Sequence, residues 1–369
     1  MPIRVLHVID NLHGGGAQVA LRYLVENADI QNVVPFVYPL RQENIDITVA
    51  GKVIKFSYCN YDPRKFSAIV KLCRTHRIDI IHAHLEKAII LSLLVSFFCK
   101  VKVVVHEHGP VFLKGFECYV YRLILRFLRH RAAIFIACSH FTAVQLVEKA
   151  RISLKKIRVI YNPVDFSKFS SVRFSRAEIR LSLNINSEDI VVGFVGRLSD
   201  YKGVDILIKA TALILERNPN YLLVLVGDGP RYKALLKLTR QLGIAERVRF
   251  LGFRDNVSEI MDAFDIAVIP SRQEAFPLVF VEFMRKKIPL VCSGAGGMAE
   301  FAKNEETALV TSKNTPEQVS DSIERLTADS ALQKKITENA YYYSEKFSLS
   351  NFVRSVQEVY CEILNYKKL

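Results

Sequence analysis

The 369-residue sequence has no apolar run long enough to cross a lipid bilayer. Its longest apolar segment, residues 88–99, is interrupted by serines and is shorter than the roughly 20 residues that a spanning helix needs. Residues 2–9 form a strand-like run without the apolar core and cleavage site of a signal peptide. The seven cysteines are odd in number and follow no disulfide or metal-binding spacing. These absences predict a cytoplasmic protein without a membrane span.

Two further signatures are missing. The glycines after the first apolar run do not form GxGxxG with an acidic residue about 20 positions later, which argues against a Rossmann oxidoreductase. Aromatic and basic residues are not interleaved in a recognisable nucleic-acid-binding motif, so no nucleic-acid partner is expected. Half of the residues are hydrophobic, so disorder is not the expected state of the chain.

Positive charge is concentrated in the first half of the chain. Residues 1–170 hold 24 Lys and Arg against 12 Asp and Glu, a net charge of +12, whereas the remaining residues contribute +2 to the total of +14. All nine histidines also lie in the first half. Such a basic half suggests an anionic partner: a phosphorylated substrate, nucleic acid or an acidic membrane surface.

The chain is too long for one ordinary core, and two domains are expected. Short branched apolar runs alternate with amphipathic segments, which predicts parallel, doubly wound α/β sheets. Strands are expected at 3–9, 33–38, 78–83, 101–106, 132–139, 190–195, 222–226, 248–251, 266–269 and 289–292. Helices are expected at 62–77 (with Pro63 near its start), 86–99, 204–216, 231–242, 316–327, 330–343 and 347–364. The polar stretch 166–187 is expected to be a linker with a short helix.

A glycine run that includes Gly15 and Gly16 follows the first predicted strand and precedes an amphipathic helix. Backbone N–H groups in such a turn can approach a phosphate, because no side chain stands in the way. A tight turn without a ligand is the alternative interpretation of the same residues.

Two histidine pairs end two predicted strands: His82 with His84, and His106 with His108. Alternation along a strand places each pair on one face of the sheet. Zinc binding is an alternative, but no carboxylate or cysteine completes a ligand set, and no metal site is predicted. A strand-end histidine held by hydrogen bonds is the other interpretation for His82 and His84.

The second half contains two groups of residues suited to a bound diphosphate. Gly196 ends a predicted strand, and Arg197 and Lys202 lie five positions apart in the loop that follows. Two cations beside one turn suit a diphosphate, which arginine can contact with two parallel hydrogen bonds. Solvated surface charges are the alternative, since most Lys and Arg are exposed.

Residues 265–300 carry two carboxylates after two neighbouring strands. Glu274 follows the strand at 266–269, Pro277 stands where a helix would begin, and Glu282 lies on that helix. A glycine run follows the next strand. The carboxyl ends of parallel strands are where open α/β sheets bind ligands.

These strings resemble a known family. The spacing of Glu274 and Glu282 in EAFPLVFVE, followed by GAGGMAE and preceded by GRLSDYKG, is similar to the E-x7-E motif and diphosphate loop of the retaining family 4 glycosyltransferases. The resemblance covers nearly the whole chain. It implies the GT-B fold, with two Rossmann-like domains that face each other across a cleft. The first is expected at residues 1–165 and the nucleotide-sugar-binding domain at 166–347, with helix 348–369 crossing back to the first.

The resemblance also implies roles for individual residues. Arg197 and Lys202 would stabilise the leaving diphosphate, Glu282 would bind the ribose hydroxyls, and Glu274 would orient the donor sugar. His108, which precedes a glycine, would contact the sugar or the acceptor, with His106 as a second candidate, and Glu107 is a nearby acid to consider. The remaining predicted substrate contacts are Gly15, Gly16, Gly196, Phe253, Phe276, Pro277 and Leu278. No cofactor and no metal are expected, because the cations can replace a metal and no DxD string is present.

Residues 111–131 form a predicted amphipathic helix rich in arginine. One interpretation is a cationic surface that docks on anionic lipid, and the other is a core-facing helix with solvated arginines. Together with the basic first half, the first interpretation suggests peripheral association with the inner face of the membrane. The acceptor is then expected to be a saccharide or a polyprenyl-diphosphate-linked saccharide of surface polysaccharide synthesis. The alternatives are a nucleotide-sugar epimerase on the same fold and a non-enzymatic membrane- or nucleic-acid-binding protein.

Overall fold

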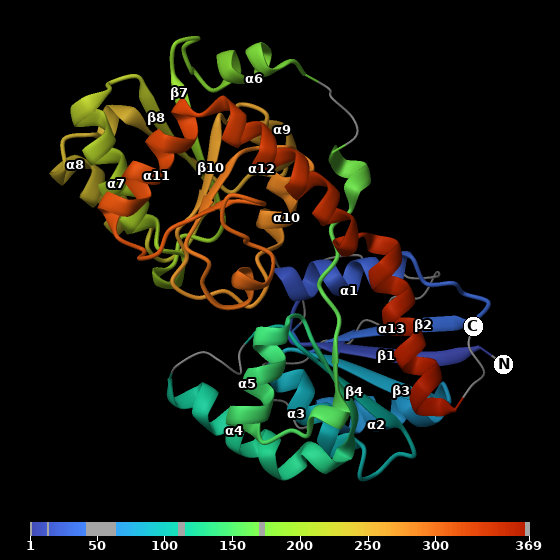
Figure 1. Cartoon of the computed structure of the whole chain (residues 1–369). Helices are drawn as coiled ribbons and strands as arrows, with labels where there is room; N and C mark the ends of the chain where they lie inside the picture. Colours follow the sequence, from blue (N-terminus) through green and yellow to red (C-terminus); the bar gives the residue numbers. More distant parts are fainter. Residues whose placement is uncertain (1, 13–14, 42–63, 110–114, 170–173, 366–369) are drawn as a thin grey trace. The chain divides into compact units, whose positions relative to one another are not determined.

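The computed structural model describes residues 2–12, 15–41, 64–109, 115–169 and 174–365. The chain divides into two compact units (Figure 1). Unit 1 comprises Met1–Pro163 together with Leu349–Leu369, and unit 2 comprises Val164–Ser348. The last helix of the chain therefore belongs to unit 1, although all of unit 2 precedes it in the sequence. The expected helix start at Asp62 and Pro63 lies outside the described residues.

Unit 1 contains, within its described residues, a six-stranded parallel sheet in the order β2-β1-β3-β4-β5-β6. Its strands are β1 (Ile3–Ile9), β2 (Val33–Pro39), β3 (Ile80–His84), β4 (Lys102–Glu107), β5 (Ala132–Ala137) and β6 (Ile157–Val159). Its helices are α1 (Gly16–Glu26), α2 (Arg64–Thr75), α3 (Glu86–Val95), α4 (Phe116–Leu128), α5 (His140–Ala150) and α13 (Leu349–Leu364). The chain order reverses between β1 and β3, which is the topological switch point of this sheet.

Side-chain alternation along the strands gives unit 1 two apolar layers. On β1, Leu6 and Val8 pack with residues of α2 to α5, whereas Ile3 and Val5 pack with α1 and α13. Because both faces are covered, the strands are apolar along nearly their whole length, as expected for a parallel sheet. This core holds the strand ends in register, so that side chains of β1, β3 and β4 meet at one edge.

Unit 2 contains a second six-stranded parallel sheet within its described residues, in the order β12-β11-β10-β7-β8-β9. Its strands are β7 (Ile190–Val195), β8 (Tyr221–Val226), β9 (Val248–Gly252), β10 (Ile266–Ile269), β11 (Leu290–Cys292) and β12 (Leu309–Val310). Its helices are α6 (Arg176–Ser182), α7 (Val204–Arg217), α8 (Tyr232–Gln241), α9 (Val257–Met261), α10 (Leu278–Arg285), α11 (Pro316–Ala328) and α12 (Ser330–Tyr343). The switch point of this sheet lies between β7 and β10.

Helices cover both faces of the second sheet. Val192 and Phe194 of β7 pack with buried residues of α7 and α11. Gly193 points to the opposite face, where a Cβ atom would lie 2.0 Å from the ring of Phe264, and this ring stands 6.4 Å from Phe283 of α10. The predicted doubly wound α/β architecture is therefore confirmed in both units.

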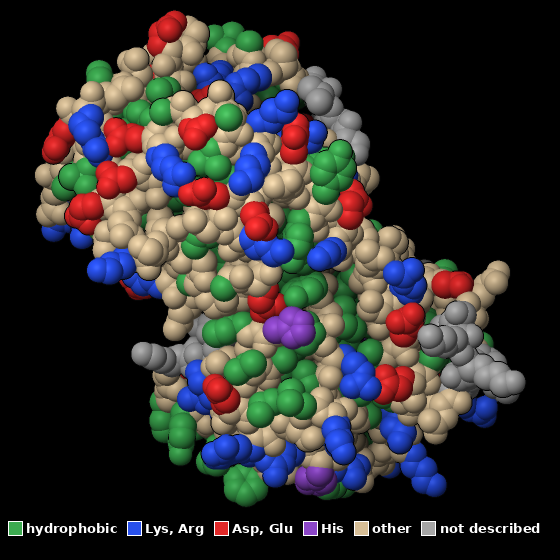
Figure 2. All heavy atoms as spheres, viewed as in Figure 1, with side chains coloured by type: hydrophobic (Ala, Val, Ile, Leu, Met, Phe, Trp, Pro, Cys, Tyr) green, Lys and Arg blue, Asp and Glu red, His purple; other side chains and the backbone are tan. Residues whose placement is uncertain are grey.

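Helix α4 exposes an apolar stripe. Only Tyr121 and Leu125 of this helix are fully buried. The exposed side chains Phe116, Tyr119, Leu123 and Phe127 recur at spacings of three and four, which places them on one face. On the face shown in Figure 2, basic side chains lie beside apolar ones in the region where Figure 1 draws α4. A helix that only covered a core would bury its apolar face, so the stripe is available for another contact.

Candidate functional site

The loops after β7 and β10 form the candidate site of unit 2. They leave the carboxyl ends of the two strands at the switch point, where open α/β sheets bind ligands. The loop after β7 includes Arg197 and ends in a single helical turn, η5 (Asp200–Lys202). The loop after β10 carries Ser271 and Glu274. Side chains that are far apart in the sequence therefore meet at this edge of the sheet.

Lys202 and Glu274 form a buried ion pair. The Nζ atom of Lys202 donates to Oε1 of Glu274 at 2.6 Å, and only 16% and 7% of the two side chains are exposed. The hydroxyl of Ser271 donates to the same Oε1 at 2.7 Å. The other oxygen, Oε2, accepts no hydrogen bond from any described residue. Glu274 is therefore a buried residue and not a solvated loop carboxylate, and one of its carboxylate oxygens is left for a ligand hydroxyl.

Two glycines allow the loops to approach this closely. Gly203 has φ +66°, and a Cβ atom there would lie 2.0 Å from the carbonyl oxygen of Pro270. Gly296 has φ +60°, and a Cβ atom would lie 2.2 Å from the carbonyl oxygen of Glu274. Such contacts exclude any side chain, and the positive φ also favours glycine. The glycine run after β11 therefore supports the backbone of Glu274 directly.

Arg197 differs from Lys202, because its exposed guanidinium makes no hydrogen bond or ion pair with any part of the chain that the structure describes. The backbone around it is fixed: Ser199 donates to its carbonyl, and Leu198 is fully buried. Gly196, just before it, is half-buried. Arg197 thus brings an unpaired cation to this edge, and Lys202 brings a cation held by a carboxylate.

Glu282 lies on α10, half-buried, and no hydrogen bond or ion pair of its side chain is found among the described residues. Burial raises the pKa of its carboxyl to about 7, and the positive charge of Lys168 partly opposes this effect. Glu282 is therefore not an ordinary exposed helix residue. A carboxylate with few partners of its own is able to accept hydrogen bonds from a ligand.

The start of α10 differs slightly from the prediction. Pro277 is the residue before the helix, with φ −79° and ψ 101°, and Leu278 is the first helical residue. Proline has no N–H group, so the free donors at this helix end begin at Leu278. The ring of Phe276 is buried against Phe301 and Phe347, with ring centroids 5.2 and 5.4 Å apart. A substrate could therefore meet Phe276 only through its backbone.

Phe253, one of the predicted substrate contacts, follows β9 and is 73% exposed. β9 occupies the edge of the sheet, next to β8. The Phe253 ring makes no ring contact with another described aromatic side chain. Its surface is accordingly open to a planar ligand.

Two supporting residues, Arg272 and Ser271, were not predicted from the sequence. Arg272 donates to both carboxylate oxygens of Asp205 at 2.8 and 2.7 Å, and to the carbonyl of Asp200 at 2.6 Å. This bidentate pair ties the loop after β10 to the start of α7. For Ser271, its spacing of three from Glu274 is compatible with the side-chain hydrogen bond and is the one signal that could have found it.

In unit 1, Gly15 precedes α1 and Gly16 is its first residue. Gly15 is exposed and Gly16 is half-buried, and no side chain caps this helix end. The N–H groups of the first turn are therefore available to an anion. His13 and Gly14 of the same loop lie outside the described residues.

The strand-end histidines of unit 1 are mostly buried. His106 is 0% exposed and its ring stands 6.3 Å from Phe352 of α13, so the prediction that His106 contacts a substrate does not fit its burial. His108 is half-buried and keeps some exposed surface. Burial lowers the pKa of His108 to about 3 and that of His106 well below its usual value, so both rings are neutral near pH 7. Of the two candidates, His108 is the accessible one.

Glu107 is a structural residue. It is completely buried, Tyr121 donates its hydroxyl to Oε2 at 2.7 Å, and the N–H of Gly109 donates to Oε1 at 3.1 Å. Burial and the negative charge of Glu107 raise the pKa of Tyr121 well above its usual value, so the phenol remains a donor. With both oxygens engaged, Glu107 fixes the turn that carries His108 and is not placed to attack a sugar.

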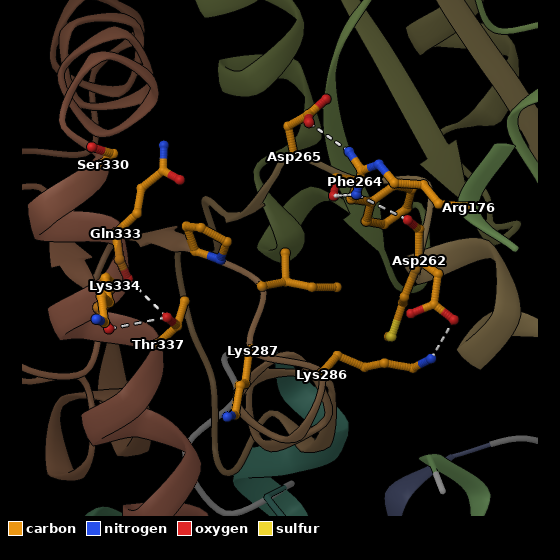
Figure 3. A pocket seen from close by; sticks show the side chains of 13 residues that line it. Arg176, Asp262, Phe264, Asp265, Lys286, Lys287, Ser330, Gln333, Lys334 and Thr337 are labelled. Carbon is orange, nitrogen blue, oxygen red and sulfur yellow. Dashed lines mark hydrogen bonds and ion pairs between the residues drawn. The ribbon is translucent and has the colours of Figure 1, made fainter. Parts of the chain in front are cut away.

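The pocket drawn in Figure 3 lies elsewhere in unit 2. Its volume is about 620 Å³, and Asp265 and Pro289, which line it, precede β10 and β11. It therefore opens at the amino ends of these strands, opposite the loops described above. Two of its cations are already paired, since Arg176 contacts Asp265 and Lys286 contacts Asp262 (Figure 3). The first pair holds α6 beside the start of β10 and the second joins the end of α10 to the end of α9, so neither indicates a ligand.

Comparison with known proteins agrees with this arrangement. Residues 5–168 match the family model described as "Glycosyltransferase Family 4", and residues 175–342 match the one described as "Glycosyl transferases group 1". An uncharacterised glycosyltransferase of Methanocaldococcus jannaschii is 33% identical over 211 residues, which cover 56% of this chain and 54% of the relative. The N-acetyl-alpha-D-glucosaminyl L-malate synthase of Bacillus anthracis is 27% identical over 320 residues, or 85% and 82% of the two chains.

Among solved structures, that of the Anabaena protein HepE in complex with UDP-glucose superposes with a TM-score of 0.82. The superposition covers 98% of this chain and 100% of the other at 23% identity, so it establishes the fold alone. The alignment to the Methanocaldococcus relative spans about half of that protein's length. The two family models together account for both units. The chain therefore has the GT-B fold and belongs to family 4 of the glycosyltransferases.

Proposed function

We propose that this protein transfers a sugar from a nucleotide-sugar donor to a saccharide or lipid-linked saccharide acceptor, with retention of anomeric configuration. The observation that carries the proposal is the group of Arg197, Lys202 and Glu274 at the switch point of unit 2. Two cations and a carboxylate with one unused oxygen suit a sugar diphosphate, which presents negative phosphates beside neutral hydroxyls. UDP-glucose is the first donor to test, because HepE was solved with it.

The chemical difficulty in this reaction is the departure of an anionic diphosphate from a carbon that becomes positively charged. Groups placed in advance where charge develops give the largest catalytic contribution. Arg197 is available to the phosphates without breaking any contact, and Lys202 would reach them while Glu274 keeps it in place. The N–H groups at the start of α10, and those of Gly15 and Gly16, would add dipoles of the same sign. We propose that this set acts without a metal at the diphosphate.

The remaining roles concern the sugar and the ribose. Oε2 of Glu274 would accept a hydrogen bond from a sugar hydroxyl, and Glu282 would accept bonds from the ribose hydroxyls. We assign His108 to the sugar or the acceptor. Because both oxygens of Glu107 already accept hydrogen bonds, a covalent intermediate on that carboxylate is disfavoured. We therefore propose a same-face substitution, in which the leaving phosphate itself assists the acceptor.

A donor screen with mass spectrometry tests the proposal, using hydrolysis as the readout when no acceptor is present. Thermal-shift measurements with UDP, GDP and ADP identify the base. Arg197→Ala should lower kcat about 10²–10³-fold, as removal of a charge-stabilising donor does. Arg240→Ala, an exposed arginine of α8, is the matched control. Equal turnover in the two variants would contradict the assignment, and conversion of the donor to an epimer without transfer would identify an epimerase instead.

We further propose that unit 1 docks on the anionic inner face of a membrane through α4, which suits a polyprenyl-diphosphate-linked acceptor. No helix in the described part of the chain is long and apolar enough to span a bilayer. The stripe of Phe116, Tyr119, Leu123 and Phe127 is exposed, and Arg126 and Arg129 accompany it. Apolar area combined with positive charge is what an interfacial helix uses to bind anionic lipid. Lys114 lies outside the described residues.

Co-sedimentation with vesicles tests this docking. The double variant Phe116→Ser/Phe127→Ser should lose binding to phosphatidylglycerol vesicles, because two of the most exposed rings are removed. Tyr342→Ser, which removes a ring that is 74% exposed in unit 2, is the control. Wild-type binding that is absent, or that is equal for neutral and anionic vesicles, contradicts the proposal.

A further inference from the structure

Five histidines of unit 1 gather at the switch point of its sheet. Parallel register places His7 of β1 beside His82 of β3, and His84 of β3 beside His106 of β4. Alternation directs these four side chains to the face covered by α1 and α13. His108 follows β4, and its ring lies 4.0 Å from that of His106 and 5.6 Å from that of His84. The two histidine pairs at the strand ends contain four of these residues, whereas His7 is brought beside them only by the pairing of β1 with β3.

The nitrogen atoms of three of these rings lie close enough to share one ion. Nδ1 of His84 is 3.3 Å from Nε2 of His108, and each of His84, His106 and His108 has a nitrogen within 4.8 Å of the other two. A tetrahedral site with Zn–N bonds of about 2.05 Å has N···N edges of about 3.3 Å. The separation of His84 and His108 therefore matches an edge of such a site, whereas it is long for a hydrogen bond.

Several polar atoms around these rings have no partner. Both nitrogens of His106 and Nδ1 of His108 are buried without a hydrogen-bond partner among the described residues, and so is Oδ1 of Asn162. Burying polar groups without partners costs free energy, and an ion coordinated by one nitrogen of His106 would compensate for part of that cost. We propose that His84, His106 and His108 bind a transition-metal ion of the Zn²⁺ class.

The surroundings of the three rings suit this role. A ligating histidine usually donates its second N–H to a nearby acceptor, which fixes the ring. Nε2 of His84 lies 3.3 Å from Nδ1 of His7, and Asn162 lies beside His108 with its Oδ1 available. With these acceptors, His84 binds through Nδ1 and His108 through Nε2.

The other group of three, His7, His82 and His84, is less suitable. Nδ1 of His82 is already 2.6 Å from the hydroxyl of Tyr360 on α13. His7 and His82 are also deeper in the sheet, whereas His108 retains exposed surface through which an ion can enter. Three imidazoles leave a fourth position for water. Nε2 of His108 cannot hold the ion and contact the saccharide proposed above at the same time, so the two would bind in alternation, and ion binding is measured without substrate.

The first experiment is equilibrium dialysis of chelator-treated, tag-free protein against Zn²⁺, with the metal content measured by mass spectrometry. About one ion per chain is expected, with no comparable response to Mg²⁺, which prefers oxygen ligands. X-ray absorption at the zinc edge should then count three imidazoles on the wild-type protein. Substoichiometric zinc, or a spectrum with one imidazole or none, overturns the proposal without the need for any variant.

Variants locate the site. His106→Asn and His84→Asn should each weaken Zn²⁺ binding by 100-fold or more, since loss of a second-shell partner alone typically costs about 10–100-fold. Asn162→Ala should weaken it about 10-fold, as a second-shell partner does. His130→Gln, an exposed histidine outside the cluster, is the matched control. If Zn²⁺ binding survives in His106→Asn and His84→Asn but is lost in His130→Gln, the ion binds at the surface and the proposed site is refuted. Circular dichroism verifies that each variant folds.

Discussion

The buried carboxyl group of Glu282 is expected to lower the stability of the folded protein and, at the same time, to contribute to nucleotide binding. Its pKa is raised to about 7 by burial, and no described residue forms an ion pair with it. Because one pKa unit corresponds to about 1.36 kcal/mol, a rise from 4.5 to about 7 makes the ionised form up to about 3 kcal/mol less favourable in the folded protein. We therefore expect Glu282→Gln to stabilise unit 2 near pH 8 while it weakens binding of the nucleotide.

The pH dependence has a definite sign. Below about pH 4.5 the carboxyl is protonated in both the folded and the unfolded chain, and its full contribution to stability is present. Between about pH 4.5 and 7 the folded chain binds more protons than the unfolded chain, so stability falls as the pH rises and stays constant above that range. Glu282→Gln should thus resemble the wild type near pH 5 and exceed it near pH 8.

Differential scanning calorimetry measures this difference. For a domain of 150–250 residues, 1 kcal/mol shifts Tm by about 2–4 °C, so the variant should melt up to roughly 6–12 °C higher near pH 8. Glu216→Gln, an exposed carboxylate of α7, is the control and should show no pH-dependent change. Isothermal titration with the preferred nucleoside diphosphate should show weaker binding to Glu282→Gln. If Glu282→Gln and the wild type differ in Tm by the same amount near pH 5 and near pH 8, the reasoning about the carboxyl pKa is refuted. If the Kd for the nucleoside diphosphate is the same in both proteins, the ribose role of Glu282 is refuted.

Further variants test three other features of the structure. Lys202→Ala should lower turnover, and it should lower the free energy of unfolding by about 3–5 kcal/mol, because it leaves Glu274 buried without its partner. The double variant Lys202→Met with Glu274→Gln should recover the stability, measured by urea titration, but not the activity. Gly296→Ala should greatly lower soluble yield or Tm, since its Cβ atom would collide with the Glu274 carbonyl, and a Tm equal to that of the wild type would count against the described loop. Tyr121→Phe should cost about 1.5–3 kcal/mol by removing a hydrogen bond to the buried Glu107, and a neutral effect in chemical denaturation would show that water replaces it.

Much of the architecture was predictable because local patterns and global fold agree. The strands at 190–195 and 266–269 and the helix at 330–343 begin and end where periodicity placed them. Other boundaries shifted. The helix expected at 86–99 ends at Val95, and the strand expected at 78–83 runs from Ile80 to His84. Apolar composition reports burial, whereas the last turn of a helix depends on hydrogen bonds that composition does not specify.

For the candidate site, the sequence alone determined which residue types are present and after which strands they lie. The specific sequence motifs were sufficient to select Arg197, Lys202, Glu274 and Glu282 as candidates. In a parallel sheet, the loops after the strands lie at the same edge, so their proximity could also be expected. Their partners were not predictable. The Lys202–Glu274 pair joins residues 72 positions apart, and its existence depends on the close approach that Gly203 and Gly296 permit.

The histidines show the same division. The sequence placed two pairs at strand ends, but alternation alone could not say that His106 lies under α13 while His108 keeps exposed surface. His7 joined them only through the pairing of β1 with β3. Periodicity along one strand reports which face a side chain occupies. Which strands are neighbours, and which helix covers that face, is decided by packing of the whole unit, because those contacts join residues distant in the chain.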